Sequence, residues 1–314
     1  MLSIVMPAFN EANNIKGMIQ ETLSVLKKTR FEDNFEIIVV DDHSDDETYQ
    51  NVEWFQNPRI NCIRLSRRSG SHVALRAGLA QAKGQPVLCL SADGQDDPNA
   101  LLEMLKKWEE GHHIVWALRS KRKEAFIIKG TALVFYKILS FLTDIKKTNI
   151  DISRADFYLL DEKVVDSINR CRERNTSLFG LIQWMGFRQA GVEYSRRERK
   201  HGKSGWNFRR RFQLMRDWIV AFSGLPLKIM SLIGIVVAFI GFFYAVFIAI
   251  HAIIGNPVPG WASLMIVVLI LTGLQMIMLG VVGEYLWRSL VESRKRPLYF
   301  IENSTLSSMN ENNE

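Results

Sequence analysis

Short apolar runs bounded by turn-forming residues recur along the first part of the chain and predict β-strands. The runs are Leu2–Met6, Phe35–Val40, Ile60–Leu65, Val87–Leu90 and Ile114–Leu118. Between them lie apolar residues at helical spacing, for example Ile15, Ile19, Leu23 and Leu26. Strands that alternate with helices predict a largely parallel α/β sheet covered on both faces. Residues 155–160 predict a further strand, which carries Asp156.

A long apolar stretch lies toward the C-terminal end, where no Asp, Glu, Lys or Arg occurs from Ile229 to Gly283. Turn-forming residues at positions 255–260 divide it in two. Leu227–Ile254 and Trp261–Leu286 are each long enough to span a hydrocarbon core of about 30 Å. The pattern therefore predicts a transmembrane hairpin of two helices. A buried helical hairpin in a soluble protein is the alternative.

Basic residues on both sides of the apolar stretch predict its orientation. Arg209–Arg216 precedes the first span and Arg288–Arg296 follows the second, whereas the connection between the spans has no Lys or Arg. By the positive-inside rule, both ends of the hairpin face the cytoplasm. Met1 leads directly into the first apolar run without a secretory signal, so we expect the N-terminal domain to be cytoplasmic. Thr131–Leu142 predicts either an amphipathic helix on the bilayer or a core helix.

Charge and cysteine content narrow the range of partners. The chain has 40 Lys and Arg against 33 Asp and Glu, and a formal net charge of +7. Because the basic residues cluster beside the apolar stretch, an anionic partner or anionic lipid headgroups are favoured. A nucleic acid is not favoured, since no nucleic-acid-reading motif accompanies these clusters. The 3 cysteines have no CxxC or Cys/His spacing, so we predict neither a zinc site nor a disulfide framework.

Polar residues follow three of the predicted strands at the points where the strands end. The segments are Pro7–Glu11, Asp41–Ser44 and Ser91–Asp97. Ligands of parallel sheets bind outside the carboxyl ends of the strands, so these residues are candidates for function. Each segment also has a purely structural interpretation as a helix cap, by Asn10, by Ser44 or Asp45, or by Asp97 before Pro98. Carboxylates crowded at one edge repel one another, however, unless a cation lies among them.

A reaction between a soluble anionic donor and a membrane-resident anionic acceptor would use this combination of features. A nucleotide sugar and a lipid phosphate fit that description. A divalent cation held by Asp93 and neighbouring oxygens would bridge the donor diphosphate, and arginines would hold the second phosphate. A phosphate monoester is largely ionised near neutral pH. We therefore expect a single in-line displacement at the anomeric carbon, with inversion and without a strong general base.

Several motifs occur together in one order along the chain. They are Pro7–Glu11, Val40–Ser44 followed by Asp46 and Thr48, Ser91–Pro98, Asp156–Phe157, Arg196-x-x-Arg199-x-x-Gly202-x-Ser204-x-Trp206, and Gly283–Tyr285 leading to Arg296–Tyr299. In this order the chain resembles the family-2 glycosyltransferases, in the polyprenyl-phosphate branch that includes dolichyl-phosphate mannosyltransferase and bacterial undecaprenyl-phosphate (bactoprenol) glucosyltransferases. The resemblance extends from Pro7 to Tyr299.

The resemblance implies a domain organisation. Residues 1–205 would form a cytoplasmic α/β catalytic domain, a Rossmann-like GT-A domain that binds a nucleotide sugar on a mostly parallel sheet. An amphipathic interface helix over 206–226, two transmembrane helices over 227–287 and a cytoplasmic tail over 288–314 would follow. The polar residues from Asn303 onward are expected to be disordered.

The resemblance also implies roles for individual residues. Donor and acceptor would be bound by Pro7, Ala8, Asn10, Glu11, Asp41, Asp42, Ser91, Ala92, Arg119, Lys129, Lys203 and Ser204. Asp93 and Gln95 would bind Mg²⁺ or Mn²⁺. Asp93, Asp156, Arg196 and Arg199 form the catalytic set, in which Asp156 approaches the sugar or the acceptor phosphate and the arginines hold the acceptor.

The implied reaction transfers a hexose from UDP-glucose or another UDP-hexose to undecaprenyl phosphate or another polyprenyl phosphate. It would take place on the cytoplasmic face of a bacterial inner membrane. The product would be a lipid-linked sugar for O-antigen, another cell-surface polysaccharide or lipid A modification. Self-association into a homo-oligomer, with a tetramer as one candidate, is implied as well.

Two departures from the family pattern occur: the one at Ser91 supports an alternative function, and the one at Arg68-Ser69 affects contacts around the donor. Ser91 stands where the family has the first Asp of a DxD signature, and Arg68-Ser69 stands where Asn more often follows Arg67. A catalytically impaired, membrane-anchored scaffold of the same fold is therefore the second hypothesis. A processive polysaccharide synthase is not favoured, because it would need more spans and because Gln183-Trp184 lacks the Gln-x-x-Arg-Trp spacing.

Overall fold

The computed structural model of the chain describes residues 1–120, 150, 154–171, 173, 177–197, 225–254 and 260–306. The chain divides into two compact units. The first takes in the described residues up to 197 and again from Arg296 onward, and the second takes in those between 225 and 295. The predicted amphipathic segments, Thr131–Leu142 and residues 206–224, lie outside the described residues.

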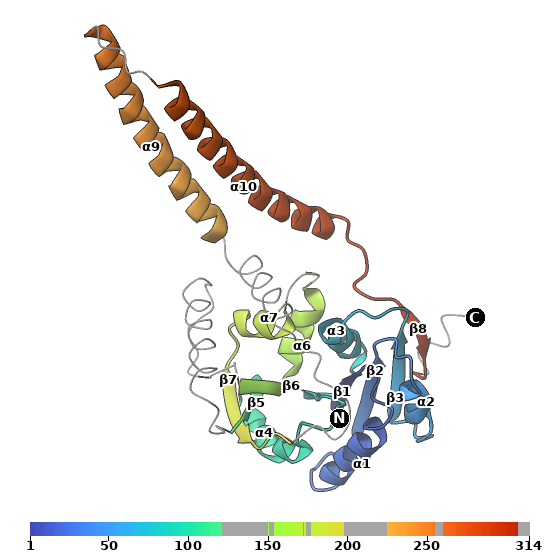
Figure 1. Ribbon diagram of the computed structural model, residues 1–314. Coiled ribbons are helices and arrows are strands. Elements are labelled where there is room, and N and C mark those ends of the chain that lie inside the picture. The colour runs from blue at the N-terminus through green and yellow to red at the C-terminus, as the bar shows by residue number, and fades with distance from the viewer. Residues whose placement is uncertain are drawn as a thin grey trace. The chain divides into compact units, whose positions relative to one another are not determined.

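The first unit is built on an eight-stranded sheet with the order β7-β5-β6-β4-β1-β2-β3-β8 (Figure 1). The strands are β1 (Leu2–Ala8), β2 (Phe35–Asp41), β3 (Ile60–Leu65), β4 (Val87–Cys89), β5 (Ile114–Arg119), β6 (Ala155–Leu160), β7 (Gln189–Tyr194) and β8 (Ile301–Ser304). The pairs among β4, β1, β2 and β3 are parallel, as is the pair β5–β7. Strand β6 runs antiparallel to β4 and β5. The predicted largely parallel α/β sheet is therefore confirmed.

Helices cover both faces of this sheet. They are α1 (Ile15–Leu26), α2 (Thr48–Glu53), α3 (Ser71–Gln81), the 3₁₀ helix η1 (Pro98–Ala100), α4 (Leu101–Glu109), α6 (Glu162–Arg170) and α7 (Leu178–Trp184). Side chains of α1, α2 and α4 pack on one face, and those of α3, α6 and α7 pack on the other.

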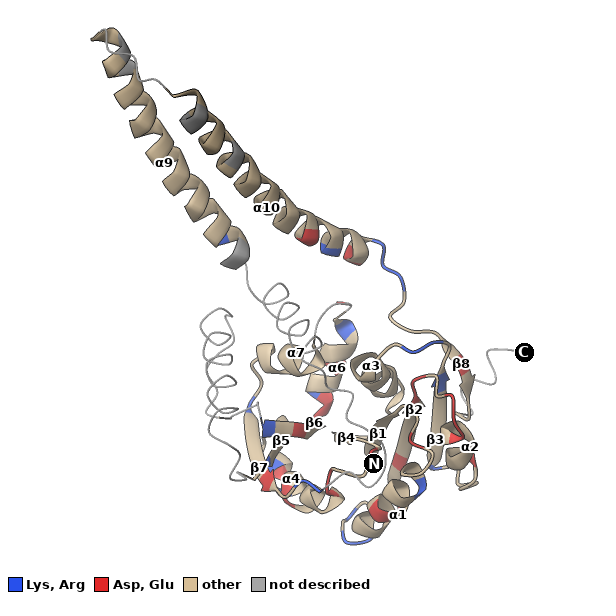
Figure 2. Cartoon of the chain, viewed as in Figure 1, with Lys and Arg blue, Asp and Glu red and all other residues tan. Residues whose placement is uncertain are grey.

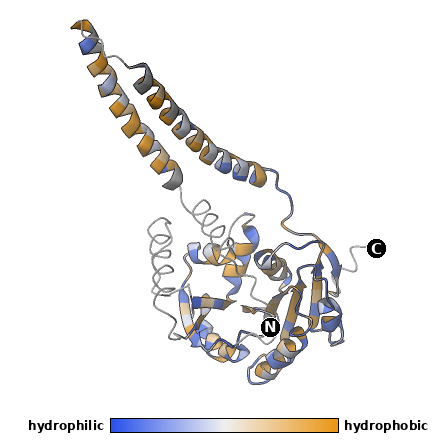
Figure 3. Ribbon diagram, viewed as in Figure 1, coloured by the Kyte–Doolittle hydropathy of each residue, from blue (hydrophilic) through white to orange (hydrophobic). Residues whose placement is uncertain are grey.

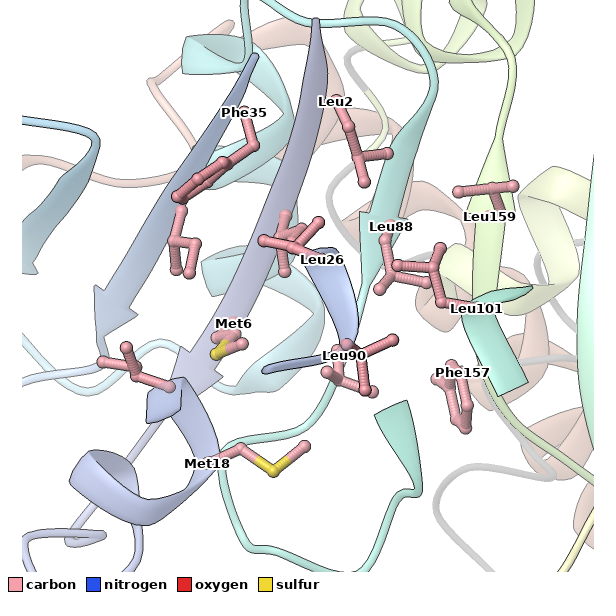
Figure 4. Packing of buried hydrophobic residues seen from close by; sticks show 14 of the residues in the cluster. Leu2, Met6, Met18, Leu26, Phe35, Leu88, Leu90, Leu101, Phe157 and Leu159 are labelled. Carbon is pink, nitrogen blue, oxygen red and sulfur yellow. The ribbon is translucent and has the colours of Figure 1, made fainter. Parts of the chain in front are cut away.

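Alternation along the central strand β1 supplies both cores. Ile4 and Met6 belong to the cluster under α1 and α4, part of which is shown in Figure 4, whereas Val5 belongs to the cluster under α3. This division follows from the two-residue period of a strand. On α3, Gly78 allows a close approach to β1, because a Cβ atom there would lie 2.3 Å from Cγ1 of Val5.

The chain returns to the sheet after its apolar stretch, which corrects the expectation of disorder for residues 303–306, whereas residues 307–314 lie outside the described residues. Strand β8 pairs antiparallel with β3, with Asn303 opposite Arg64. The amide of Cys62 donates to Oγ1 of Thr305 at 2.8 Å, and Leu306 is buried. The physical reason is that β3 would otherwise be an unpaired edge, and pairing satisfies its backbone groups.

The second unit contains two long apolar helices, α9 (Leu225–Ile253) and α10 (Trp261–Ser293). Leu227–Ile248 and Leu264–Ser293 are long and apolar enough to cross a membrane, each with a mean hydropathy of 2.6. The orange colour along both helices in Figure 3 shows this apolar composition. Large side chains such as Phe239 and Phe243 are exposed at 61% and 65%. The alternative of a hairpin buried within a soluble protein therefore does not describe these helices.

Candidate functional site

The loops that follow β1 and β2 are joined by hydrogen bonds from backbone amides to side chains. The bonds run from Asn10 N to Ser44 Oγ (3.0 Å), Glu11 N to Thr48 Oγ1 (2.9 Å), Ala12 N to Asp46 Oδ2 (3.0 Å) and Asp45 N to Asn10 Oδ1 (2.9 Å). Asn10, Ser44 and Asp45 therefore do not cap helices. Helix α1 begins at Ile15 after Asn14, and α2 begins at Thr48. We call these two joined loops the β1–β2 loop pair.

Pro7 and Ala8 close the end of β1 beside this loop pair. Ala8 is buried, and its carbonyl accepts a hydrogen bond from the amide of Asp42 at 2.9 Å. The carboxylate of Glu11 is largely buried and accepts a hydrogen bond from Nδ2 of Asn14 at 2.6 Å. The structure thus gathers the sequence-predicted residues of the first two motifs at the carboxyl ends of β1 and β2.

Asp41 and Asp42 have different surroundings. The side chain of Asp41 is fully buried, and its oxygens accept hydrogen bonds from Nη1 of Arg64 at 2.7 Å and from the amide of Ser44 at 3.0 Å. Asp42 accepts from the amides of Ser69 and Gly70 at 2.6 and 2.7 Å. Burial raises the pKa of Asp42, and these amide bonds oppose the rise. Asp41 therefore holds the loop, and Asp42 holds the segment before α3.

The departure at Arg68-Ser69 lies in that same segment. The guanidinium of Arg68 lies over the ring of Phe9, 3.9 Å from its centroid. This cation–π contact joins the segment before α3 to the β1 loop. With Arg68 and Ser69 at these positions, the segment contacts the loop pair. The amide of Ser69 donates to Asp42, and the guanidinium of Arg68 lies over the ring of Phe9.

The segment after β4 forms a tight turn around Asp93. The amide of Asp93 donates to Oγ of Ser91 at 3.3 Å, and the amide of Gln95 donates to Oδ1 of Asp93 at 3.1 Å. The amide of Ser91 in turn donates to Oδ2 of Asp96 at 3.1 Å, and Ala92 is buried. Ser91 therefore shapes the turn with its hydroxyl group. Asp97 accepts from the amide of Asn99, so its structural interpretation as a cap is confirmed.

A second group of charged side chains surrounds Asp156 on β6, whose side chain is 12% exposed. Its carboxylate lies 3.2 Å from Nε of Arg119 and 3.3 Å from Nη1 of Arg196, and it accepts a hydrogen bond from the hydroxyl of Tyr194 at 2.6 Å. Nη2 of Arg196 donates to Oε1 of Gln95 at 2.7 Å. Arg119 lies on β5 and Asp156 on β6, two strands whose charged residues are coloured in Figure 2, and Arg196 lies just after β7. We call Asp156, Arg119, Arg196 and Tyr194 the Asp156 cluster.

Asp96 connects the Asp93 turn to this cluster. Its Oδ1 lies 3.2 Å from the hydroxyl of Tyr194, and its side chain is almost completely buried. Burial, together with the negative charges of Asp93 and Asp156, raises the pKa of Asp96 to about 7. Burial and the carboxylates of Asp96 and Asp156 raise the pKa of Tyr194. The raised pKa of Asp96 lies near neutral pH, beside the charged groups of the cluster.

The residues around Asp93 include oxygen atoms that could contribute to a site for a divalent cation. Carboxylate and amide oxygens suit Mg²⁺ or Mn²⁺, and Mg²⁺ is often held by one or two carboxylates together with substrate phosphates. Among the described residues there is no group of three or more His, Cys, Asp or Glu that could hold a metal ion by itself. Oε1 of Gln95 is bound by Arg196, which leaves Asp93 as the stronger candidate ligand. The donor set fits a cation that also binds the diphosphate of a substrate.

Some predicted residues lie outside the described part of the chain: Lys129, Arg199, Lys203 and Ser204. Sequence reasoning, conversely, did not single out Tyr194, Arg64 or Arg197. Arg197 binds Glu21 of α1 at 2.6 Å and Asp97 at 3.0 Å. In the sequence, only its position directly after Arg196 could have pointed to Arg197, because Glu21 and Asp97 come from distant parts of the chain.

Comparisons with known proteins place the chain among related sequences. Residues 3–164 match a family model described as Glycosyl transferase family 2. An uncharacterized glycosyltransferase, YkcC, of Bacillus subtilis is 38% identical over 96% of this chain and 93% of its own length. A prophage bactoprenol glucosyl transferase homolog of Escherichia coli is 34% identical over 96% of this chain and 98% of its own. A crystal structure of glucosyl-3-phosphoglycerate synthase from Mycobacterium tuberculosis is similar over 70% of this chain and 77% of its own, with a TM-score of 0.49 and 18% identity.

Proposed function

The chain belongs to glycosyl transferase family 2, as its motifs predicted, and on that basis we propose that it transfers a hexose from a UDP-sugar to a polyprenyl phosphate. UDP-glucose is the proposed donor, undecaprenyl phosphate the proposed acceptor, and a lipid-linked sugar the product. Relatives named bactoprenol glucosyl transferase support this acceptor. The alignment with the Shigella phage SfV protein covers 96% of this chain, which is too much to leave out either apolar helix.

The Asp156 cluster is the observation that carries the proposal. Two guanidinium groups lie within 3.3 Å of one carboxylate, and Gln95 links one of them to the turn that contains Asp93. Transfer between a diphosphate and a phosphate requires positive charge at both groups. Arg119 and Arg196 supply it from the protein beside a carboxylate suited to a divalent cation.

The proposed step needs no proton transfer by the enzyme. An ionised phosphate oxygen of the acceptor forms a bond to the anomeric carbon, the bond from that carbon to the donor diphosphate breaks, and UDP leaves. Arg119 and Arg196 stabilise phosphate charge, and Asp156 holds both guanidinium groups in place. Asp93 would hold Mg²⁺ or Mn²⁺, which when bound supplies charge stabilisation to the leaving diphosphate.

The apolar helices α9 and α10 would anchor this domain to the membrane that contains the acceptor. We propose that both ends of the hairpin face the cytoplasm, where soluble UDP-sugars are present. The domain organisation belongs to the same proposal: a catalytic domain over 1–205, an interface helix over 206–226, spans over 227–287 and a tail over 288–314. Within that tail, β8 adds a strand to the catalytic sheet.

A catalytically impaired scaffold is the second candidate, because Ser91 removes one carboxylate from the turn. The hydroxyl of Ser91 binds the amide of Asp93, so the turn keeps a defined shape without the missing Asp. Activity therefore depends on whether Asp93 and the substrate diphosphate together hold the cation.

A transfer assay tests the proposal. Purified protein in detergent is given undecaprenyl phosphate and a panel of radiolabelled UDP-hexoses, with and without EDTA. We expect transfer from one donor that EDTA abolishes and that Asp93→Ala lowers by about 100-fold or more. Glu110→Ala, an exposed carboxylate on the turn after α4, is the matched control and should have full activity. Full activity of Asp93→Ala would exclude the metal role, and no transfer from any donor by folded protein would favour the scaffold.

A further inference from the structure

Strand β8 brings one acidic side chain, Glu302, to the loop that follows β2. Oε2 of Glu302 lies 3.2 Å from Nε of Arg64 on β3 and 3.4 Å from Nδ1 of His43. Both contacts join segments that are far apart in sequence, and 238 positions separate Arg64 from Glu302. Strand β8, near the C-terminal end of the chain, therefore contacts the β1–β2 loop pair.

Arg64 connects Glu302 to the buried end of β2. Its Nη1 donates to Asp41 at 2.7 Å, and its Nη2 donates to the carbonyl of Ser44 at 3.0 Å. Together with the bond to Glu302, every nitrogen of the guanidinium has a partner. The planar guanidinium group fixes the relative positions of its three partners. Glu302 thus orients the group that holds both Asp41 and Ser44.

His43 gives Glu302 a second, direct contact with the same loop. This residue has a φ of 60°, which is the left-handed region, and Nδ1 of its ring lies 3.1 Å from the carbonyl of Leu65. A non-glycine residue in that region needs support from its surroundings. Glu302 is therefore linked to the residues on both sides of Asp42. It contacts His43 directly, and it is connected to Asp41 through Arg64.

We propose that Glu302 is a positioning residue for the donor nucleotide. By holding Arg64 and His43, it sets the geometry of Asp41–Ser44, and so the affinity for UDP and UDP-sugars. This inference rests on the proposed function, in which that loop binds the nucleotide. The segment after α10 is thus a functional part of the donor site.

The exposure of the Glu302 and Arg64 side chains sets the expected size of the effect of a Glu302 substitution. The side chain of Glu302 is 44% exposed and that of Arg64 is 20% exposed, so solvent screens the pair and its loss should not unfold the protein. Donor binding depends on the loop geometry and should respond more clearly. We expect Glu302→Ala to raise the Kd for UDP and the KM for the donor about five-fold.

The experiment uses the full chain in detergent and measures UDP binding by isothermal titration calorimetry, together with kcat, donor KM and acceptor KM. Glu302→Gln keeps an oxygen for Arg64 and should give about half the effect of Glu302→Ala. Asn303→Ala, on the same strand, is the control for a general disturbance of β8 and should bind UDP like the wild type. Hydrogen exchange of the amides at positions 43–45 should become faster in Glu302→Ala only.

The outcomes separate this inference from the function on which it rests. A donor-specific loss of affinity in Glu302→Ala, with kcat and acceptor KM unchanged, supports it. Unchanged UDP affinity in that variant, or an equal loss in Asn303→Ala, would overturn it and leave the proposed function standing. Absence of UDP binding to the wild-type protein would overturn the proposed function itself. A lower melting temperature with normal UDP affinity would assign Glu302 a structural role only, and this also overturns the inference.

Discussion

The β1–β2 loop pair and the Asp156 cluster lie at the same sheet and are held together by different interactions. Amide-to-side-chain hydrogen bonds join the loop pair, mostly between residues 34 to 37 positions apart. The cluster is held by contacts between charged groups on β5, β6 and residues that follow β7. Asp156 and Arg119 belong to neighbouring antiparallel strands, and a long stretch of sequence separates them.

This difference assigns different properties to the two regions. Three of the four hydrogen bonds that join the loop pair use hydroxyl or amide acceptors, which do not titrate near neutral pH, so these bonds should be insensitive to pH. The contacts of the cluster depend on the charges of the Asp156 carboxylate and of the two guanidinium groups beside it. Asp96, which lies next to the cluster, has a pKa of about 7. Under the proposed function, the loop pair would bind the nucleotide in a fixed geometry, and the cluster would stabilise charge that changes during the reaction.

The largest expected effect comes from removing the charge at the centre of the cluster. Asp156→Asn removes the carboxylate charge that lies beside both Arg119 and Arg196, and we expect kcat to fall about 100-fold while the Kd for UDP changes little. Steady-state transfer kinetics and UDP titration measure the two quantities. Glu193→Gln, which removes an exposed carboxylate from Arg154 on the same sheet, is the control and should be nearly neutral. Loss of UDP affinity in Asp156→Asn would instead place Asp156 in the donor site.

The second largest expected effect is a pH-dependent change in the free energy of unfolding, which should distinguish the cluster from the loop pair. Burial raises the pKa of Asp96 from 3.8 to about 7, so the folded state holds this proton more tightly than the unfolded state. Its contribution to stability is present at low pH and is lost as the pH rises toward 7. Asp96→Asn should therefore stabilise the protein more at pH 8 than at pH 5, by about 2 kcal/mol in the free energy of unfolding.

Thermal or denaturant unfolding in detergent with EDTA at the two pH values measures this difference. EDTA keeps divalent cations away from Asp93, whose charge contributes to the raised pKa of Asp96. The same stability difference between variant and wild type at pH 5 and pH 8 would contradict the titration of Asp96. It would also remove the contrast in pH response between the two regions.

The smallest expected effect lies in the loop pair. Thr48→Val removes the hydroxyl that accepts from the amide of Glu11 and donates to Asp46, and we expect a loss of about 1 kcal/mol in the free energy of unfolding. The loss should be the same at pH 5 and pH 8, because no titrating group is removed. Thr48→Ser keeps the hydroxyl and should retain most of the stability. A pH-dependent loss in Thr48→Val would show that the loop pair, too, is sensitive to charge.

Much of the candidate site could be predicted from the sequence because its motifs follow strands. Asn10, Asp42 and Asp93 each lie within four residues of the end of an apolar run, and the parallel order of β1, β2 and β4 brings such residues to one edge. Ser44 and Asp45 were open to interpretation as caps, and only the hydrogen bonds to Asn10 decided against it. Tyr194 could not be predicted, because an isolated aromatic residue in a strand is ordinarily part of a core.

The sequence by itself determined strands β1 to β6, the order of the motifs and the two apolar helices, since hydrophobic periodicity and turn residues are local signals, but it did not predict β7. Only the tertiary structure decided that Ile301–Ser304 pairs with β3, because this short polar segment has no strand pattern of its own and gains order from an unpaired edge. The same holds for the contact of Glu302 with Arg64 and for Asp156 between two arginines. Such contacts depend on which distant segments the sheet brings together, and no local property of the chain encodes that.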